Sequence, residues 1–238
     1  MSSQHIVIVG GSSGNGFATA RLLLAKGHKV TITGRSAARL QAAQQALSGD
    51  LHTIVMDATA EADLPTVFDQ IGSFDHLVLA LGSSRGLGAF AAVSLAEVKA
   101  GFEEKVYAHF ATAQAALPRL RKDGSLTFIS AVTAHAAMPG TAGIGAANAA
   151  VAALVPILAS ELRPLRVNAV SPGVIDTPWW GFLTEEQKAP VFADYASKTP
   201  VGRVGQPEDI AQVIAFLIAD TFMSGQTIVC DGGLRLSV

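Results

Sequence analysis

Residues 6–16 read IVIVGGSSGNG, and this stretch decides the fold. Its first four residues are apolar and mostly β-branched, which predicts a strand covered on both faces. Gly10, Gly14 and Gly16 follow, and an apolar helical pattern begins directly after them. Such glycines let the backbone approach a pyrophosphate, and the helix N-terminus supplies N–H groups and partial positive charge. The stretch therefore predicts a dinucleotide-binding turn, with a merely tight turn as the alternative.

Apolar runs alternate with helical patterns along the rest of the chain. One helical stripe is formed by Ile210, Val213, Ile214, Leu217 and Ile218, and another by Val151, Leu154, Val155, Leu158 and Leu162. Ser36 is the expected N-cap of the helix that carries Leu40, Ala43 and Leu47. The expected strands cover residues 5–9, 29–33, 51–55, 76–81, 125–130, 166–170 and 227–230. This alternation predicts one α/β domain over residues 1–238, a Rossmann fold with a doubly wound, seven-stranded parallel sheet and helices on both faces.

Composition narrows the classes of partner. Hydrophobic residues make up 50% of the chain and charged residues 15%, and the net charge is −2. This charge gives no electrostatic reason for binding nucleic acid or an anionic membrane. The six histidines lack a metal-ligand spacing, so no metal is expected. We also expect no signal peptide and no apolar stretch near the roughly 20 residues of a membrane span. Cys230 is the only cysteine, which favours the cytoplasm.

The spacing Gly-x-x-x-Gly-x-Gly resembles that of the short-chain dehydrogenase/reductase family. The resemblance covers nearly the whole chain, because RVNAVSPGVIDTP at 166–178, Gly202–Arg203, Pro207–Glu208 and the DGG at 231–233 also match. It implies a nicotinamide cofactor. It also implies a homodimer or homotetramer, formed through the long helices around Lys105 and Asn148.

The resemblance assigns roles in cofactor binding to residues along the chain. Asp57 would hold the adenine amino group, and the Thr177 hydroxyl would hold the nicotinamide carboxamide. The expected cofactor-binding residues are Gly10, Ser12, Ser13, Gly14, Asn15, Gly16, Arg35, Asp57, Ala58, Gly82, Asn148, Pro172, Gly173, Ile175 and Thr177.

Arg35 follows the second predicted strand, where an acidic residue would bind the ribose of NAD and repel a 2′-phosphate. A guanidinium pairs with a phosphate and stacks on adenine instead. The sequence therefore predicts NADP(H) in preference to NAD(H). The alternative is that Arg35 is a solvated surface charge.

The four catalytic positions that the resemblance implies carry other residue types. The family's asparagine, serine, tyrosine and lysine fall on Lys105, Ala131, Ile144 and Asn148. Isoleucine cannot donate a proton, and asparagine carries no charge to lower a neighbouring pKa.

Other ionisable residues are candidates to replace the missing acid. The sharper hypothesis is that Lys105 or His135 does so, since Lys105 should project near the cofactor and His135 should lie where substrates of related enzymes sit. Further candidates for the pocket wall are His109, Ser83, Ser84 and Arg85. The alternative for each is a solvated or interface side chain.

Residues 177–205 are expected to form a lid over the substrate. They carry Trp179, Trp180, Phe182, Phe192 and Tyr195. These aromatics predict an apolar lining, or else packing at a subunit interface.

Three functions fit these residues. The first is an NADP(H)-dependent oxidoreductase with a non-standard active site, acting on an unknown carbonyl- or quinone-like small molecule. The second is a noncatalytic NADP(H)-binding sensor, and the third is a structural subunit with no small-molecule substrate.

Overall fold

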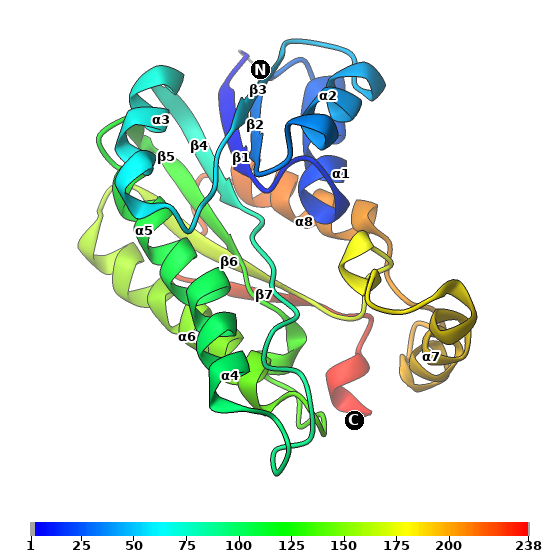
Figure 1. Cartoon of the computed structure of the whole chain (residues 1–238). Helices are drawn as coiled ribbons and strands as arrows, with labels where there is room; N and C mark the ends of the chain where they lie inside the picture. The colour runs from blue at the N-terminus through cyan, green and yellow to red at the C-terminus, as the bar shows by residue number, and fades with distance from the viewer. Residues whose placement is uncertain (1–2, 238) are drawn as a thin grey trace.

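The computed structural model describes residues 3–237 and has a seven-stranded, wholly parallel sheet between two layers of helices (Figure 1). The strand order is β3-β2-β1-β4-β5-β6-β7, which confirms the predicted doubly wound Rossmann fold. The strands are β1 (His5–Val9), β2 (Lys29–Gly34), β3 (Leu51–Val55), β4 (Phe74–Leu79), β5 (Leu120–Ile129), β6 (Arg166–Pro172) and β7 (Thr227–Cys230).

Each face of the sheet has its own set of helices. One face packs against α1 (Gly14–Ala25), α2 (Ala37–Ala46) and α8 (Pro207–Ala219). The other packs against α3 (Leu64–Ile71), α5 (Ala108–Ala116) and α6 (Ala142–Glu161). The remaining helices are α4 (Leu95–Phe102), α7 (Glu185–Lys198), the π-helical turn η2 (Glu103–Tyr107) and the 3-10 turns η1 (Glu61–Asp63), η3 (Val132–Ala134), η4 (Pro178–Trp180) and η5 (Leu234–Leu236).

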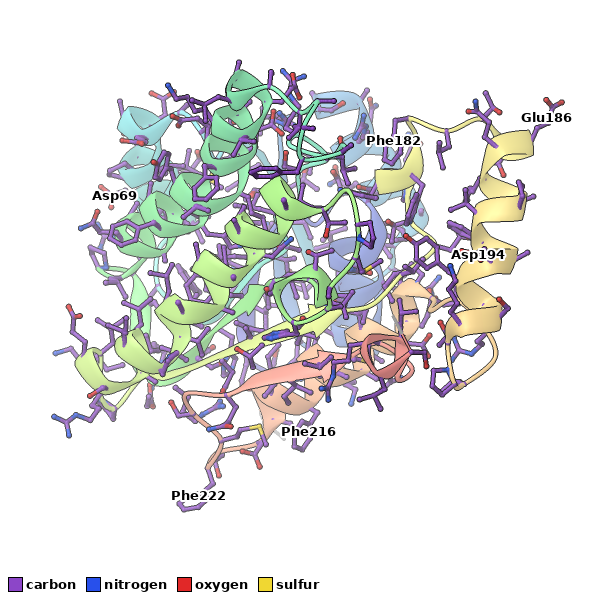
Figure 2. All side chains as sticks on the ribbon, turned by 90° about the horizontal axis from the view of Figure 1, so that it is seen from below. Asp69, Phe182, Glu186, Asp194, Phe216 and Phe222 are labelled. Carbon is purple, nitrogen blue, oxygen red and sulfur yellow. The ribbon has the colours of Figure 1, made fainter. Side chains whose placement is uncertain are left out.

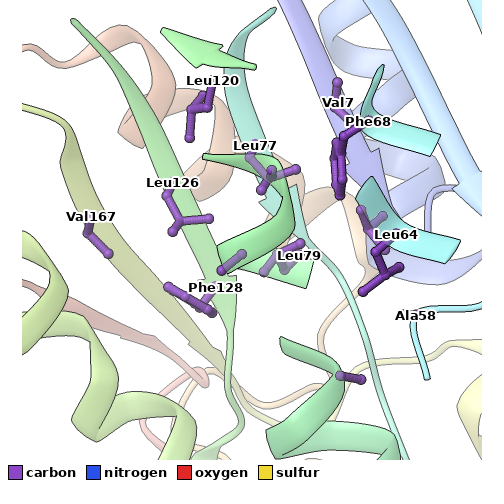
Figure 3. Close-up of a cluster of buried hydrophobic side chains, with 14 of the residues drawn as sticks. Val7, Ala58, Leu64, Phe68, Leu77, Leu79, Leu120, Leu126, Phe128 and Val167 are labelled. Atoms are coloured by element: carbon purple, nitrogen blue, oxygen red, sulfur yellow. The ribbon is translucent and has the colours of Figure 1, made fainter. Parts of the chain in front are cut away.

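Alternation along β1 divides the core into its two halves. Val7 and Val9 point to one face and Ile6 and Ile8 to the other, because successive side chains of a strand lie on opposite faces. All four are at most 2% exposed. Figure 3 shows the first half, in which Val7 lies beside Phe68 of α3. Strands buried on both faces explain why their sequences are apolar throughout.

The predicted helical stripes face this core. Ile210, Ile214, Leu217 and Ile218 of α8 are buried, as is Val151 of α6. Ser36 is the N-cap of α2, where its hydroxyl accepts a hydrogen bond from the Arg39 amide at 3.3 Å. The apolar period and the cap therefore gave the positions of these helices correctly.

Four predicted strands have different bounds, of which β2 and β6 only extend further, to Gly34 and Pro172. Residues 76–81 were expected as one strand, but β4 ends at Leu79, and Ala80 donates its amide to the Val9 carbonyl at 2.8 Å before the chain leaves the sheet. β5 begins at Leu120, and its pairing with β4 is irregular between Phe74 and His76. An irregular register gives no clean periodicity, so the sequence did not reveal this first segment.

The expectation that no apolar stretch is long enough to span a membrane is wrong for α6. By length and composition this helix could cross one, with a mean hydropathy of 1.9 over an 18-residue window. Its many alanines, with valine, leucine and isoleucine among them, raise the hydropathy without forming a continuous run of large apolar residues. In this fold α6 packs against β5, β6 and η3, as core helices do.

The sheet topology indicates which edge of the sheet binds a ligand. Strand order reverses between β1 and β4, and in open parallel sheets ligands bind at the carboxyl ends of the strands beside such a reversal. The segment with η4 and α7 extends from this edge, and α7 projects away from the sheet, with Phe182 on the chain just before it (Figures 1 and 2).

Candidate functional site

The turn between β1 and α1 is shaped by backbone contacts that leave no room for side chains. Gly10 has a φ of +83°, and a Cβ there would lie 2.5 Å from the Ala80 carbonyl oxygen. A Cβ on Gly16 would overlap the Gly10 carbonyl. A Cβ on Gly14 would touch Thr177 at 3.4 Å, so Thr177 lies directly over the turn. The glycines therefore permit a compact turn with exposed backbone amides.

The first turn of α1 has its amides uncapped. Its N-cap, Ser13, makes no side-chain cap bond, and no acidic residue lies in this turn. The Asn15 Oδ1 atom is buried and has no hydrogen-bond partner within the described residues. An uncapped helix start with free donors suits a phosphate group, and the unused acceptor suits a hydroxyl. The turn thus fits the dinucleotide that the sequence predicted.

Two adjoining cavities open along the carboxyl edge of the sheet, with volumes of about 370 Å³ and about 630 Å³. The smaller lies over the ends of β2 and β3, and the larger extends from the glycine turn toward η3, α6 and η4. Every residue expected to bind the cofactor lines one cavity or both. The smaller has Ser12, Asp57 and Ala58; the larger has Gly14, Asn15, Gly16, Asn148, Pro172, Gly173, Ile175 and Thr177; Gly10, Ser13, Arg35 and Gly82 line both.

The smaller cavity brings together the residues that would recognise an adenosine. Arg35, just after β2, lines this cavity, and so does Arg39 in the first turn of α2. Asp57 accepts hydrogen bonds from the amide and hydroxyl of Thr59 at 3.0 and 2.8 Å. The Thr59 amide bond is the largest cause that holds the pKa of Asp57 below its usual range, and Arg35 adds a smaller effect. This cavity therefore offers two guanidinium groups and the carboxylates of Asp57 and Glu104.

Lys105 lies at the floor of the larger cavity, in the π-helical turn η2. Its side chain is 6% exposed, and Nζ donates to the carbonyls of Leu81 and Ile129 at 2.8 and 2.7 Å. These carbonyls come from the chain just after β4 and the end of β5. Burial lowers the pKa of Lys105 to about 7. Nζ therefore has one N–H direction unused and sits near its point of half-protonation at neutral pH.

His109 lies one turn beyond Lys105 but does not reach either cavity. It is fully buried, with Nδ1 2.6 Å from the Lys105 carbonyl and Nε2 3.2 Å from the Leu79 carbonyl. Burial lowers its pKa to about 3, so the ring is neutral at physiological pH. Carbonyl oxygens only accept, so a neutral ring satisfies one of these contacts. His109 therefore ties the π-helical turn to β4, and the structure gives it no contact with a ligand.

The other three expected catalytic positions also line the larger cavity. Ile144 and Asn148 are 8% and 6% exposed. The side-chain nitrogen Nδ2 of Asn148 donates to the Thr133 hydroxyl at 3.1 Å and to the Ile144 carbonyl at 2.9 Å. Its Oδ1 has no partner among residues 3–237. Ala131 contributes only a methyl group. Ser130 donates its hydroxyl to the Asn148 carbonyl at 2.9 Å, so it also serves to hold α6.

The resemblance assigns asparagine to position 105 and lysine to position 148. This chain has the reverse, with lysine at 105 and asparagine at 148. In the sequence the two differences look unrelated, because the two positions are 43 residues apart. The structure brings both side chains to the same cavity. A lysine charge is therefore still present there, but it arrives from η2 instead of α6.

The expectation that His135 lies in the substrate pocket is wrong. It follows η3 with an exposed side chain and is not among the residues that line either cavity. The 3-10 turn reverses the chain after β5, and this turns the side chain outward. The structure thus brings Lys105, and not His135, to the wall of the larger cavity.

An aromatic cluster covers the far end of the larger cavity. Trp180 contacts Trp179, Phe182, Phe192 and Tyr195, with ring centroids 4.9–6.2 Å apart. All of these except Phe192 line the cavity. The predicted lid over 177–205 thus contains an aromatic wall formed by η4 and α7.

Both indole nitrogens of this wall are bonded within the protein. Trp179 donates to the Ser83 carbonyl and Trp180 to the Ile175 carbonyl, each at 3.0 Å. Ser83, Ser84 and Arg85 line the same end, where Ser83 donates to Glu104 at 2.7 Å and Arg85 pairs with Glu97 at 3.1 Å. Apart from the Tyr195 hydroxyl, the aromatic rings of this wall therefore present carbon surfaces, and its arginine is already paired.

Comparison with known proteins decides the family. The family model of enoyl-(acyl carrier protein) reductase matches residues 9–235. The chain belongs to the short-chain dehydrogenase/reductase family. It is 29% identical to carbonyl reductase family member 4 of Danio rerio, with 98% of this chain and 99% of that protein covered. It is 30% identical to a 3-oxoacyl-[acyl-carrier-protein] reductase of Thermotoga maritima, with 98% of each covered.

Solved structures of short-chain dehydrogenase/reductases share the fold. A small-chain dehydrogenase in complex with NADPH is 29% identical, with a TM-score of 0.84 over 99% of this chain and 100% of that one. A short-chain type dehydrogenase/reductase from Mycobacterium ulcerans is also 29% identical, with a TM-score of 0.90 over 100% and 92%. The chain is therefore an oxidoreductase of this family and binds a nicotinamide cofactor.

Several cavity residues with polar or charged side chains were not singled out from the sequence, among them Arg39, Glu104 and Thr133. Arg39 could have been found, since it lies in the first turn of the expected helix, three residues after its N-cap Ser36 and close to Arg35 in the sequence. Glu104 lines both cavities beside Lys105, and Thr133 lies in the turn after β5. No local pattern marks Thr133, because its place depends on the contact between η3 and α6.

Proposed function

We propose that this short-chain dehydrogenase/reductase is an NADP(H)-dependent reductase of carbonyl- or quinone-like small molecules, with a non-standard active site in which Lys105 replaces the family's tyrosine as proton donor. The observation that carries the proposal is the buried Lys105 ammonium at the floor of the larger cavity. It is held by two carbonyls and has one N–H direction unused.

The residues that would hold the cofactor follow the sheet edge. The amides from Ser12 to Gly16 would bind the pyrophosphate, and Asp57 the adenine. The unused Oδ1 of Asn148 would accept a hydrogen bond from a ribose hydroxyl, and Thr177 would bind the carboxamide. The chemistry that bound NADPH supplies is a hydride from its nicotinamide ring.

The preference for NADPH over NADH rests on charge. Arg35 and Arg39 line the adenosine end together, and Gly34, Arg35 and Ser36 leave no carboxylate at the end of β2. Two guanidinium groups favour a 2′-phosphate, whereas a ribose hydroxyl alone needs no such charge. The related small-chain dehydrogenase that binds NADPH supports the same choice.

Lys105 would serve the chemical step in two ways. Its positive charge would stabilise the negative charge that develops on a carbonyl oxygen as the carbon is reduced. Its third N–H would then give the proton that completes the alcohol. A donor whose pKa is about 7 is matched to this task at neutral pH.

The aromatic wall favours a neutral, apolar substrate. Trp179, Trp180, Phe182 and Tyr195 line this end, and the indole N–H groups are already bonded. Arg85 is paired with Glu97, so it offers no free cation for a carboxylate. An aromatic aldehyde, ketone or quinone would fill such a space.

We also propose a homodimer or homotetramer in the cytoplasm, without nucleic-acid or membrane partners. Tyr107, Phe110 and Ile157 are about half exposed on the helices around Lys105 and α6, and a second copy would cover them. The net charge of −2 gives no attraction to nucleic acid or an anionic membrane, and the single cysteine supports the cytoplasm.

The test is NADPH consumption by the purified protein with a panel of aromatic aldehydes, ketones and quinones, followed by product analysis. The reductase predicts an alcohol or hydroquinone in amounts equal to the NADPH consumed. Tight NADPH binding without product would instead support the sensor. Absence of NADPH binding would support the structural subunit.

A further inference from the structure

The polar groups around the reaction end of the larger cavity differ in how much hydrogen-bonding capacity they have left. Asn148 is held rigidly, since its amide nitrogen donates both to Thr133 Oγ1 and to the Ile144 carbonyl. This leaves its nitrogen fully used. The asparagine therefore serves the cavity only through its oxygen, which can accept but cannot donate.

Three hydroxyl groups lie on the end of β5, the turn η3 and the start of α6. Ser130 gives its proton to the Asn148 carbonyl at 2.9 Å, and Thr141 gives its proton to the Met138 carbonyl at 2.7 Å. Thr133 differs, because its oxygen accepts from Asn148 and its own proton has no acceptor within the described part of the chain. Thr133 also lines the larger cavity. Of these three hydroxyls it alone keeps a donor for a ligand.

The position of Thr133 is fixed by close packing against α6. A Cβ on Gly145 would lie 2.8 Å from the Thr133 carbonyl oxygen, so the glycine allows η3 to rest directly on the helix. The same contact brings the Thr133 hydroxyl to the helical turn that carries Ile144 and Asn148. These are the positions where the family places its tyrosine and lysine.

We infer that the Thr133 hydroxyl donates the hydrogen bond that orients the substrate's carbonyl oxygen, in place of the family's serine and tyrosine at Ala131 and Ile144. The inference rests on the proposed reductase function and names a second group of its site. A threonine hydroxyl is too weak an acid to release its proton here. Thr133 thus orients the oxygen, and Lys105 supplies charge and proton.

The experiment uses the full chain saturated with NADP⁺, which cannot reduce a carbonyl. The probe is 4-(dimethylamino)cinnamaldehyde, a neutral aromatic aldehyde that fits the aromatic wall. Its absorption moves to longer wavelength when its carbonyl oxygen accepts a stronger hydrogen bond. We expect a red shift on the wild-type protein, loss of part of that shift in Thr133→Val, since the Lys105 ammonium still reaches the same oxygen, and its return in Thr133→Ser.

Affinity provides the second readout. Removing one neutral hydrogen bond should weaken probe binding by about 3- to 10-fold in Thr133→Val, with NADP⁺ binding unchanged. Thr112→Val is the matched control, because Thr112 is buried on α5 and its hydroxyl has no partner among residues 3–237. It should keep both the shift and the affinity of the wild type.

The outcomes separate this inference from the proposed function. A full red shift in Thr133→Val, or bound probe with no shift on the wild-type protein, overturns the role of Thr133 even if NADPH is consumed with carbonyls. A shift that depends on Thr133 in a protein that never consumes NADPH supports the hydrogen bond and overturns the reductase.

Discussion

The two halves of the carboxyl edge differ in how far they keep the residues of the family. At the glycine turn, each contact depends on the backbone, and Gly10 and Gly16 sit where a Cβ would collide with a carbonyl. At the reaction end, the four expected catalytic side chains are replaced, yet the cavity remains and is lined by Lys105, Asn148 and Thr133. Steric contacts therefore fix the residue types at the glycine turn, whereas the chemistry of the reaction end depends on side chains that can be substituted.

The difference teaches where substitution is tolerated in this fold. A residue type at the cofactor turn cannot change without moving β4 or α1. A charge near the reaction centre can instead enter from another element, as Lys105 does from η2. The predictions below test this difference between the glycine turn and the reaction end.

Gly16→Val should abolish cofactor binding. Its side chain would overlap the Gly10 carbonyl and displace the amides at the start of α1. We expect NADPH affinity, measured by fluorescence titration, to fall by at least about 100-fold, the loss of two or more charge-assisted hydrogen bonds. Gly27→Val is the control, since that glycine ends α1 with open space around it, although its φ of +82° adds strain. Near-normal binding by the Gly16 variant would show that the turn does not hold the nucleotide.

The rate of carbonyl reduction should fall as the pH rises through the pKa of Lys105. Burial lowers that pKa to about 7, and a proton donor acts only in its protonated form. The expected profile of kcat/KM is flat well below this pH and falls by about 50-fold from pH 7 to pH 9. Lys105→Arg keeps a fixed charge, so its lower rate should be independent of pH over this range. A profile unchanged by that substitution would assign the titration to another group.

Arg35→Asp should reverse the choice of nucleotide. The carboxylate would repel a 2′-phosphate and accept a hydrogen bond from a ribose hydroxyl. Loss of a charged hydrogen bond predicts about 10- to 100-fold weaker NADPH binding, with NADH affinity equal or improved. Arg39→Ala should produce a smaller change in the same direction. If both nucleotides weaken equally, Arg35 is a general surface charge.

Ile144→Tyr should add an acid to the reaction end. The phenol would project from α6 into the cavity that contains the Lys105 charge, which lowers the pKa of a nearby phenol. We expect reduction of simple ketones to rise by about 100-fold over the wild type, near the low end of what a positioned acid contributes. The gain should vanish in Ile144→Tyr combined with Lys105→Met. A gain that survives the double substitution would mean that Lys105 does not reach this position.

The sequence predicted most of the fold because its signals are local. Strands buried on both faces read as apolar runs, and the stripes of α6 and α8 follow the helical period. The errors occur where the chain departs from regular geometry. β4 ends two residues early at the cofactor edge, and β5 begins with an irregular register. Neither departure has a periodic signature.

The candidate site was predictable only where motif and backbone coincide. All residues expected to bind the cofactor line the two cavities, because their positions follow from the turn and the strand ends. His135 and Thr133 show the limit. They are two residues apart, yet η3 turns one outward and holds the other against α6. Only the contact between Thr133 and Gly145 decides which side chain enters the cavity.

The most direct test of the account is a single turnover of NADPH-loaded protein with an aromatic aldehyde, for the wild type and Lys105→Met. The account predicts that both bind NADPH with similar affinity, and that the variant transfers hydride about 10²- to 10⁴-fold more slowly. Equal rates in the two proteins, or a wild-type protein that binds NADPH and never oxidises it, would contradict the claim that Lys105 has taken over the chemistry.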